Sequence, residues 1–276
     1  MSPPPTDNGP DEQSPRPPRP ALPQATLSLS LQRGVGLLVV FSQERPWLGI
    51  AELADLAGLS RSTTFRYVDT LVQLGYLEQG RASKYGLAPR AADPGRRIVH
   101  ELRFAHRNAG KVLADLRDAL GYTVSMGALD GTAVLYIHRF FGHRRGQHLI
   151  DGELRVGAYI PAYCTALGKV LLASLSEPER RERIADIHLV PEGPRSITTH
   201  GKLIAELHGI DPNVPTLSDE ESSPDARSIA VLVSASDSTP PMAIDVTVPS
   251  TAFTAVGLLD EIGPALTRAR DLIAHA

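Results

Sequence analysis

The chain has 276 residues, a formal net charge of −3 and a single cysteine. One cysteine excludes an internal disulfide framework and a cysteine-based zinc finger within the chain, and no apolar run approaches the roughly 20 residues that span a bilayer. Because the net charge is slightly negative, any binding to nucleic acid must rest on a local patch. We expect a soluble, cytoplasmic chain of one large or two ordinary domains, with no membrane partner.

The first 25 residues are dominated by proline, with Ser, Gln, Asp and Arg and almost no large apolar side chains. Such a composition cannot bury enough apolar surface to offset the entropy lost when the chain becomes ordered. We therefore predict a disordered tail over residues 1–25.

Three helices are predicted next, each from the spacing of its apolar residues. The first runs from Ser28 to near Ser42, and its apolar face is Leu31, Val35, Leu38 and Val39. The second is short and ends at Gly58 in the C-cap position; its apolar face is Ile50, Leu53, Ala54 and Ala57. The third begins after the N-cap Ser60 and ends at Gly75; its inner face is Phe65, Val68, Leu71 and Val72.

Two short strands follow, "YLEQ" and "KYGL", joined by the turn-like "GRAS". The order of helix, short helix, tight turn, helix and two-stranded ribbon is typical of a winged helix-turn-helix, which we assign to residues 26–90. In that geometry the second helix of the pair enters the major groove of DNA with its N-terminal residues facing the base edges.

The candidate DNA contacts are polar or basic side chains at the front of the third helix, one turn further on, and on the ribbon: Ser60, Arg61, Ser62, Thr63, Thr64, Arg66, Tyr67, Arg81 and Lys84. Arg61 can reach guanine or a phosphate, the hydroxyl side chains are short enough to approach bases or backbone, and Arg66 lies where the sugar-phosphate wall is expected. The alternative is a merely solvated helix face on which Ser60 is only an N-cap.

A long helix rich in Arg and Lys is predicted from about Pro94 to Leu120, so residues 91–120 are assigned to a linker. After Gly121, "YTVSMGALDG" and "TAVLYIHRF" predict a β-hairpin through the turn dipeptide Asp130-Gly131. A buried helix "CTALGKVLLASL", the strands "RSIAVLVSAS" and "PMAIDVTV", and an amphipathic helix from Thr251 complete a domain over residues 121–276. Its mixture of strands and helices indicates an α/β or α+β domain.

The segment "PAYCTALGK" passes from Pro161 into a helix whose first amide groups lack intrahelical partners and whose dipole is positive at that end. This end suits a carboxylate, and Ala166 and Gly168 keep it open. The alternative is a core helix capped by Thr165.

Two catalytic interpretations of the same segment are weak. Gly168-Lys169 is not a P-loop, because Tyr163 and Val170 stand where that motif requires Gly and a Mg²⁺-binding Ser or Thr. Cys164 next to a helix start could be a nucleophile of lowered pKa, but no base can be placed beside it, and a small buried residue is the favoured interpretation.

Arginine and histidine residues recur at the end of the predicted hairpin: His138, Arg139, His143, Arg144, Arg145 and His148. Three arginines would repel a metal cation and no carboxylate lies between them, so we expect no metal site, and no segment indicates a cofactor. An arginine that anchors an effector carboxylate and a solvated hairpin end remain as alternatives.

Several segments resemble the IclR family of bacterial transcription regulators: "LQRGVGLLVVF", "LSRSTTFRYVDTLVQLGYL", "KYGLAPR", "PAYCTALGKVLLASL" and "ARSIAVLV". Within the family, "GYTVSMGALDG", "VLYIHRF" and "PAYCTALGKVLLA" are most similar to regulators of aromatic acid catabolism, of the protocatechuate and β-ketoadipate type. The resemblance implies an α+β chain with an N-terminal winged helix-turn-helix, a linker helix and a C-terminal GAF-like α/β domain that binds an effector and supports oligomers.

The resemblance also implies a function. The chain would be a sequence-specific regulator and not an enzyme, controlled by a small molecule such as an aromatic or other carboxylic acid. It would bind a pseudo-palindromic operator in double-stranded DNA as a homodimer or a dimer of dimers. The alternatives are a small-molecule-modifying enzyme with an appended DNA-binding head and a winged helix that binds protein.

The family's effector contacts fall on six positions here: Ala166, Leu167, Asp219, Ser228, Asp245 and Thr247. Asp245 departs from the small polar residue that relatives commonly carry. Its charge would repel an acid effector unless the carboxyl group is paired or protonated.

Overall fold

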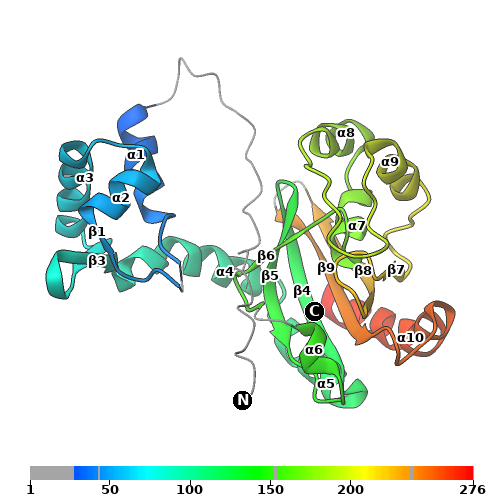
Figure 1. Ribbon diagram of the computed structural model, residues 1–276. Coiled ribbons are helices and arrows are strands. Elements are labelled where there is room, and N and C mark those ends of the chain that lie inside the picture. The colour runs from blue at the N-terminus through cyan, green and yellow to red at the C-terminus, as the bar shows by residue number, and fades with distance from the viewer. Residues whose placement is uncertain (1–27, 43, 152–153, 237–238, 276) are drawn as a thin grey trace, which may run out of the picture. The chain divides into compact units, whose positions relative to one another are not determined.

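The computed structural model describes residues 28–42, 44–151, 154–236 and 239–275, so the predicted tail over residues 1–25 lies outside the described residues. The described chain forms two compact units that divide between His100 and Glu101 (Figure 1). None of the helices in these ranges combines the length and apolar character needed to cross a membrane.

The N-terminal unit is a winged helix-turn-helix. Its helices are α1 (Leu29–Leu38), α2 (Ile50–Ala57) and α3 (Arg61–Gln73), and its strands are β1 (Leu48–Gly49), β2 (Leu77–Gln79) and β3 (Lys84–Leu87). The strands form an antiparallel sheet of order β1-β3-β2. Gly58 ends α2 in the left-handed region at φ 63°, which a glycine adopts without strain. The fold expected for this part of the sequence is confirmed.

The core of this unit corrects two predicted helix faces. In α1 the buried residue is Leu37, whereas Leu31 and Val35, together with Val39 at the C-cap, are exposed. In α3 the inward stripe is Thr64, Val68 and Leu71, and Phe65 faces outward. Both helices carry apolar side chains on more than one side, so their spacing alone could not indicate which side packs against the neighbouring helices.

The predicted linker is two helices rather than one: α4 (Asp93–Ala105) and α5 (Ala109–Leu120). The break lies at residues 106–108, where side chains bond to other elements. His106 Nε2 lies 3.0 Å from Ser234 Oγ, and Asn108 Nδ2 donates to the carbonyl of Leu272 at 2.6 Å. Because α5 also buries Leu113 and Leu116 in the core of the C-terminal unit, it belongs to that unit.

The C-terminal unit is built on a six-stranded antiparallel sheet of order β6-β5-β4-β9-β8-β7. Its strands are β4 (Thr123–Asp130), β5 (Ala133–Phe140), β6 (Tyr159–Pro161), β7 (Thr216–Asp219), β8 (Ala226–Ser236) and β9 (Thr239–Pro249). The remaining helices are α6 (Gln147–Asp151), α7 (Ala166–Ala173), α8 (Glu177–Ala185), α9 (His200–His208) and α10 (Ala255–Ala274). The hairpin and the helices and strands expected in this half are thus confirmed.

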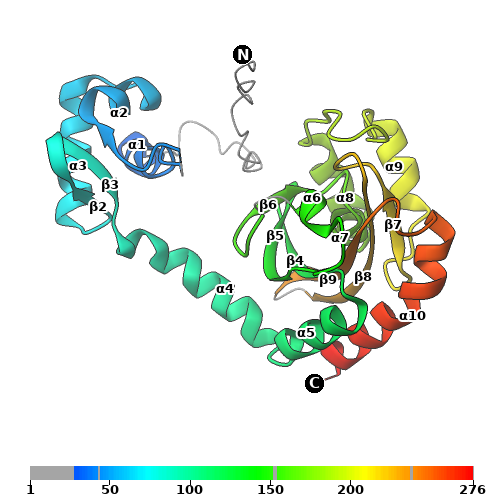
Figure 2. The same cartoon turned by 60° about the horizontal axis from the view of Figure 1, so that its bottom comes forward.

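Helices cover both faces of this sheet (Figure 2), and each face has its own apolar core. On one face, α5 and α10 pack against residues such as Met126, Ile244 and Val246. On the other face, α7 packs against Ala230 and Ala243, and α8 and α9 extend that core. Because successive residues of a regular strand point to opposite faces, the two cores indicate which face each side chain takes outside the register shifts near Met126 and Ser234.

Candidate DNA interface and effector site

The front of α3 is organised by Ser60. The Ser60 hydroxyl accepts a hydrogen bond from the backbone amide of Thr63 at 3.3 Å and donates one to Thr63 Oγ1 at 2.8 Å. This N-cap satisfies one of the free amides at the start of the helix. It also leaves the next residues, Arg61 and Ser62, exposed on the outer side of the first turn.

The predicted DNA contacts on α3 divide by exposure. Ser60, Arg61, Ser62 and Arg66 are exposed, whereas Thr63 and the Tyr67 ring are half-buried. Thr64 is 0% exposed, and its hydroxyl donates to the carbonyl of Ser60 at 3.0 Å. The expectation that Thr64 contacts DNA is therefore wrong, because its side chain belongs to the packed side of the helix.

Phe65 is a candidate contact that the sequence reasoning missed. Its side chain is 53% exposed and lies on the same outward side as Arg61, Ser62 and Arg66. Placing the inward stripe at positions 64, 68 and 71 would have revealed it, because position 65 is then about 100° away around the helix. An exposed aromatic ring beside basic residues can make apolar contact with a thymine methyl group.

The ribbon presents Arg81 at its turn and Lys84 at the start of β3. Ala82 and Ser83, in the turn itself, both have φ 55°. Lys84 Nζ lies 4.0 Å from Glu52 Oε2, and both side chains are about half exposed. The Trp47 ring packs so closely on the ribbon that a Cβ atom on Gly80 or Gly86 would lie 2.7 or 2.9 Å from it. The indole therefore supports the ribbon directly.

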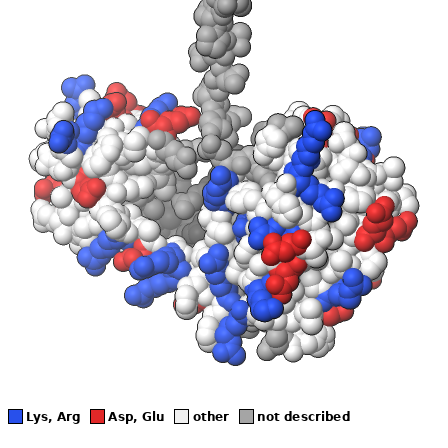
Figure 3. Space-filling model, turned by 90° about the horizontal axis from the view of Figure 1, so that it is seen from below, with Lys and Arg blue, Asp and Glu red and all other residues white. Residues whose placement is uncertain are grey.

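Charges of both signs lie on the face of the molecule that Figure 3 presents, where Lys and Arg side chains are interspersed with Asp and Glu. The exposed basic residues of α3 and of the ribbon, Arg61, Arg66, Arg81 and Lys84, are thus a local set rather than part of a wholly basic surface.

The predicted effector residues of the sheet lie mostly on the face covered by α7. Strands β8 and β9 pair Ser228 with Thr247 and Ala230 with Asp245, and Ala230 belongs to the α7 core. Directly paired residues point to the same face. Ser228, Asp245 and Thr247 are therefore brought together under α7, whose own Ala166 and Leu167 are fully buried.

Asp245 is a buried carboxyl group, with 4% of its surface exposed. Its Oδ2 accepts from the Thr247 hydroxyl at 3.2 Å, and the Ser125 hydroxyl also hydrogen-bonds to it. Burial raises the pKa of Asp245 to about 6, and the nearby Arg139 and these hydrogen bonds oppose that shift. The site therefore contains a carboxyl group whose pKa is raised but still lies below neutral pH, so that it is mostly ionised at pH 7.

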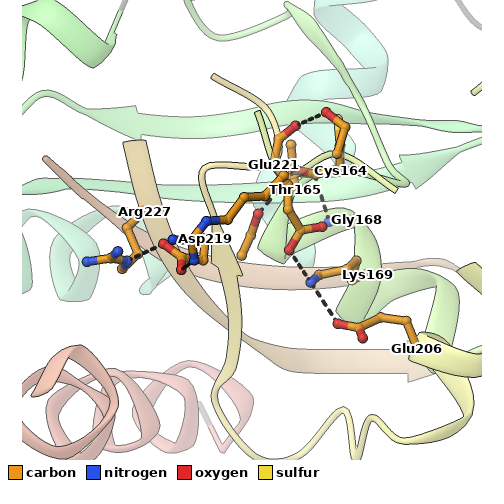
Figure 4. A network of polar contacts seen from close by, with 11 residues as sticks. Cys164, Thr165, Gly168, Lys169, Glu206, Asp219, Glu221 and Arg227 are labelled. Atoms are coloured by element: carbon orange, nitrogen blue, oxygen red, sulfur yellow. Dashed lines mark hydrogen bonds and ion pairs between the residues drawn. The ribbon is translucent and has the colours of Figure 1, made fainter. Parts of the chain in front are cut away.

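Asp219 lies apart from the other predicted effector residues of the sheet. It pairs with Arg227 at the end of β7, one residue beyond Ser218, whose hydroxyl bonds to Cys164 O on the α7 side. Asp219 thus points to the opposite face, where its carboxylate bridges Arg195 and Arg227, with Arg227 Nε 2.5 Å from Oδ1 (Figure 4). Strand alternation removes it from the group formed by Ser228, Asp245 and Thr247.

Lys169 in α7 forms a buried ion pair. Its side chain is 1% exposed, and its Nζ donates to Glu221 Oε1 at 2.6 Å and to Glu206 Oε1 at 3.0 Å (Figure 4). Burial raises the pKa of Glu221, and Lys169 opposes this. The lysine that superficially suggests a phosphate loop is thus the counterion of two glutamates.

Cys164 is buried at the start of the same segment. Burial raises the pKa of its thiol far above the ordinary value, and the charges of Glu192 and Glu221 add to this effect. A thiol that stays protonated is a poor nucleophile, so the side chain acts as a small packing residue.

The arginine and histidine cluster at the end of the hairpin does not form one site. Arg139 faces the α7 side, where its Nη1 donates to Ser125 Oγ at 3.1 Å. His138 lies on the opposite face against Gly110 and Phe140, and burial together with Arg103 lowers its pKa to about 4. Arg144 bonds to the carbonyl of Leu120 at 2.7 Å. Among the described residues, no three His, Cys, Asp or Glu side chains come together as metal ligands would.

A winged helix-turn-helix joined to an α/β unit of this kind defines a two-domain DNA-binding protein. Residues 30–81 match the model of the IclR helix-turn-helix domain, and residues 98–275 match that of the C-terminal domain of the bacterial transcriptional regulator IclR. The chain belongs to the IclR family of bacterial transcriptional regulators, which confirms the resemblance of its sequence segments.

Individual relatives agree with this assignment. The Pca regulon regulatory protein of Pseudomonas putida is 30% identical over 203 residues, which are 73% of this chain and 68% of that protein. The regulator KdgR of Escherichia coli K12 is 29% identical over 74% of this chain and 76% of its own length. An IclR homolog from Microbacterium hydrocarbonoxydans, solved with 4-hydroxybenzoate, superposes with a TM-score of 0.73 at 22% identity, covering 89% of this chain and 98% of that one, which shows a shared fold.

Proposed function

We propose that this chain binds a pseudo-palindromic operator in double-stranded DNA and that a small carboxylic acid, bound on the α7 face of its sheet, alters that binding. The observation that carries the proposal is the exposed front of α3, where an N-cap at Ser60 leaves Arg61, Ser62 and Arg66 facing outward in a winged helix-turn-helix. As a DNA-binding regulator, the protein acts in the cytoplasm.

On DNA, Arg61 donates to a guanine edge or a phosphate, and Phe65 contacts a thymine methyl group. Ser60, Ser62 and Thr63 lie close enough to the same groove for short hydroxyl contacts, whereas Arg66 and Tyr67 meet the sugar-phosphate wall. Arg81 and Lys84 of the ribbon contact the backbone beside it.

The effector site consists of the polar side chains under α7. Arg139 is the cation next to Ser125 and Asp245, and it supports the binding of an acid. The proposal of an aromatic or other carboxylic acid is supported by the similarity to a Pca regulon regulatory protein and to a homolog solved with 4-hydroxybenzoate. An acid that binds equally well to the conformation that binds DNA and to the one that does not would have no effect. Regulation therefore requires that the acid bind one of these conformations more tightly than the other.

We also propose that the working form is a homodimer or a dimer of dimers. Apolar residues of α1 and of its C-cap are exposed in the single chain, among them Leu31, Val35 and Val39. Exposed apolar patches of this kind mark protein–protein contacts. Two copies related by a two-fold axis would present two copies of α3 to the two halves of a palindrome.

The proposal is tested by fluorescence anisotropy with duplex DNA from upstream of the chain's own gene, with other genomic fragments and with random duplex, at two salt concentrations. We expect at least one fragment to bind about 10³-fold more tightly than random duplex, with a preference that survives the higher salt. Equal binding to every duplex, abolished by salt, would contradict a sequence-specific function.

Arg61→Ala separates base reading from backbone contact. If Arg61 reads a guanine, the substitution should weaken operator binding by about 1–3 kcal/mol and relax the preference at one base pair. Uniform weakening on all sequences would instead make Arg61 a phosphate contact. Arg45→Ala, which changes an arginine of the same unit outside α3 and the ribbon, is the matched control.

A further inference from the structure

Three side chains form a row across the α7 face of the C-terminal sheet. Arg139 in β5 is directly paired with Ser125 in β4, and Ser125 is directly paired with Asp245 in β9. The row thus places a guanidinium group, a hydroxyl group and a carboxyl group on three adjacent strands, which lie about 4.8 Å apart in such sheets.

These three groups are connected by hydrogen bonds. Arg139 Nη1 donates to Ser125 Oγ at 3.1 Å, and the Ser125 hydroxyl bonds in turn to the Asp245 carboxylate. The Arg139 guanidinium also lies 4.6 Å from the centre of the Tyr136 ring and 5.3 Å from that of Phe141. The cation at one end of the row is therefore held between aromatic rings.

The two oxygens of Asp245 differ in their surroundings. Oδ2 accepts from the Thr247 hydroxyl at 3.2 Å. Oδ1 is buried, and within the described ranges no group donates a hydrogen bond to it. A buried carboxylate oxygen without a donor is destabilising, so a hydrogen-bond donor placed at Oδ1 by a ligand would stabilise the ionised carboxylate.

The chemistry of that donor follows from the chemistry of the acceptor. An ionised carboxylate only accepts hydrogen bonds, and it repels a second carboxylate. A hydroxyl or amino group therefore fits Oδ1, and a second carboxylate does not.

We infer that the effector carries a hydroxyl or amino group that donates a hydrogen bond to Asp245 Oδ1, and that the site therefore selects a hydroxylated or amino-substituted carboxylic acid over the same acid without that group. This inference rests on the proposed effector function. It reconciles a buried aspartate with an acidic ligand, because the carboxylate recognises the ligand's substituent rather than its acid group.

The test uses matched acids on the full-length chain. Dissociation constants are measured by isothermal titration calorimetry for benzoate, 3- and 4-hydroxybenzoate, 3,4-dihydroxybenzoate, 4-aminobenzoate and terephthalate, and for propionate with lactate. We expect at least one hydroxylated or amino acid to bind 10-fold or more tightly than its unsubstituted parent, and terephthalate, with its second carboxylate, to bind no better than benzoate.

Two substitutions assign the selectivity to one oxygen. Asp245→Ala should reduce the difference between the dissociation constants of the substituted and the parent acid to below 3-fold. Asp245→Asn keeps one acceptor oxygen and should retain part of this difference. Asp130→Asn is the control, since it changes an aspartate of the same sheet whose role is to accept from the Tyr159 hydroxyl, and it should leave the ratio unchanged.

Two results would overturn the inference. In the first, a parent acid binds as tightly as its hydroxylated partner, as expected if a water molecule donates to Oδ1. In the second, Asp245→Ala leaves the ratio of the two dissociation constants unchanged. If no acid binds, the proposed acid effector fails, and the melting temperature of ligand-free Asp245→Asn decides the inference separately. A value equal to or above that of the wild type shows that the carboxylate is not kept for stability, as the inference requires, whereas a clear decrease gives Asp245 a structural role and overturns the inference.

Discussion

At the scale of single residues, the buried ion pair of Lys169 is the clearest determinant of stability. Lys169→Met removes the only cation that Glu221 contacts at hydrogen-bond distance among the described residues, and it leaves a buried carboxylate uncompensated. We expect the free energy of unfolding to fall by about 3 kcal/mol, measured by urea denaturation. Glu206→Gln is the control, because Glu206 is half-exposed and its loss should cost less than about 1 kcal/mol.

The buried carboxyl group of Asp245 should make the stability of the chain depend on pH. Its pKa rises from 3.8 to about 6 on folding, so between these values the folded chain holds a proton that the unfolded chain has released. Stability is therefore lost as the pH rises through this window, and the full cost, about 3 kcal/mol, is present above it. Arg139 is the charged neighbour that limits this cost.

Asp245→Asn cannot titrate and should escape that cost. We expect the variant to be more stable than the wild type at pH 7.5 and nearly equal to it at pH 3.5, as measured by thermal unfolding in the absence of ligand. A stability difference that does not change with pH would show that the carboxyl group is not protonated on folding.

At the scale of elements, the basic side chains of the ribbon should contribute to the salt dependence of DNA binding. If Arg81 neutralises one phosphate, Arg81→Ala should reduce the slope of log K against log salt concentration by about one unit. Lys84→Ala should change it less, because Glu52 lies 4.0 Å from Lys84 Nζ and partly compensates its charge. Anisotropy titrations over a range of salt concentrations measure both slopes, and unchanged slopes would exclude the ribbon from the DNA interface.

Elements bounded by local signals could be predicted from the sequence. Gly58 and the N-cap Ser60 mark the turn between α2 and α3, and the spacing of apolar residues within α7 marks a helix buried along its length. These features depend on chemistry within a few residues of the chain. The sequence therefore predicted the winged helix-turn-helix and the hairpin of β4 and β5 without tertiary information.

The features that could not be predicted from the sequence depend on a distant partner. The end of α4 depends on Asn108 reaching Leu272, and the inward face of α1 depends on its packing in the N-terminal core. Asp219 was assigned by resemblance, and its orientation depends on Arg227 and on the register of β7. Helices α8 and α9 lie in a stretch to which the sequence reasoning assigned no structure, although Ser176 and Glu179 form a capping box that could have marked the start of α8.

At the scale of the whole molecule, assembly is the property to test. Leu31→Glu combined with Val35→Glu places charges on the exposed apolar side of α1. We expect this double variant to have a lower molar mass by light scattering than the wild type, and to bind the full operator more weakly. Leu56→Glu, which changes an exposed leucine of α2, is the matched control. An unchanged mass in the double variant would place the contact between copies elsewhere.

Trp47 is the only tryptophan of the chain, and its ring lies on the ribbon of the N-terminal unit. Intrinsic emission excited at the indole band therefore reports on that unit alone, without a label. Contact of DNA with the ribbon should alter the emission directly. Effector binding in the C-terminal unit can alter it only by a change that reaches the first unit, so a titration of the unlabelled protein with acid is a direct optical measure of communication between the two domains.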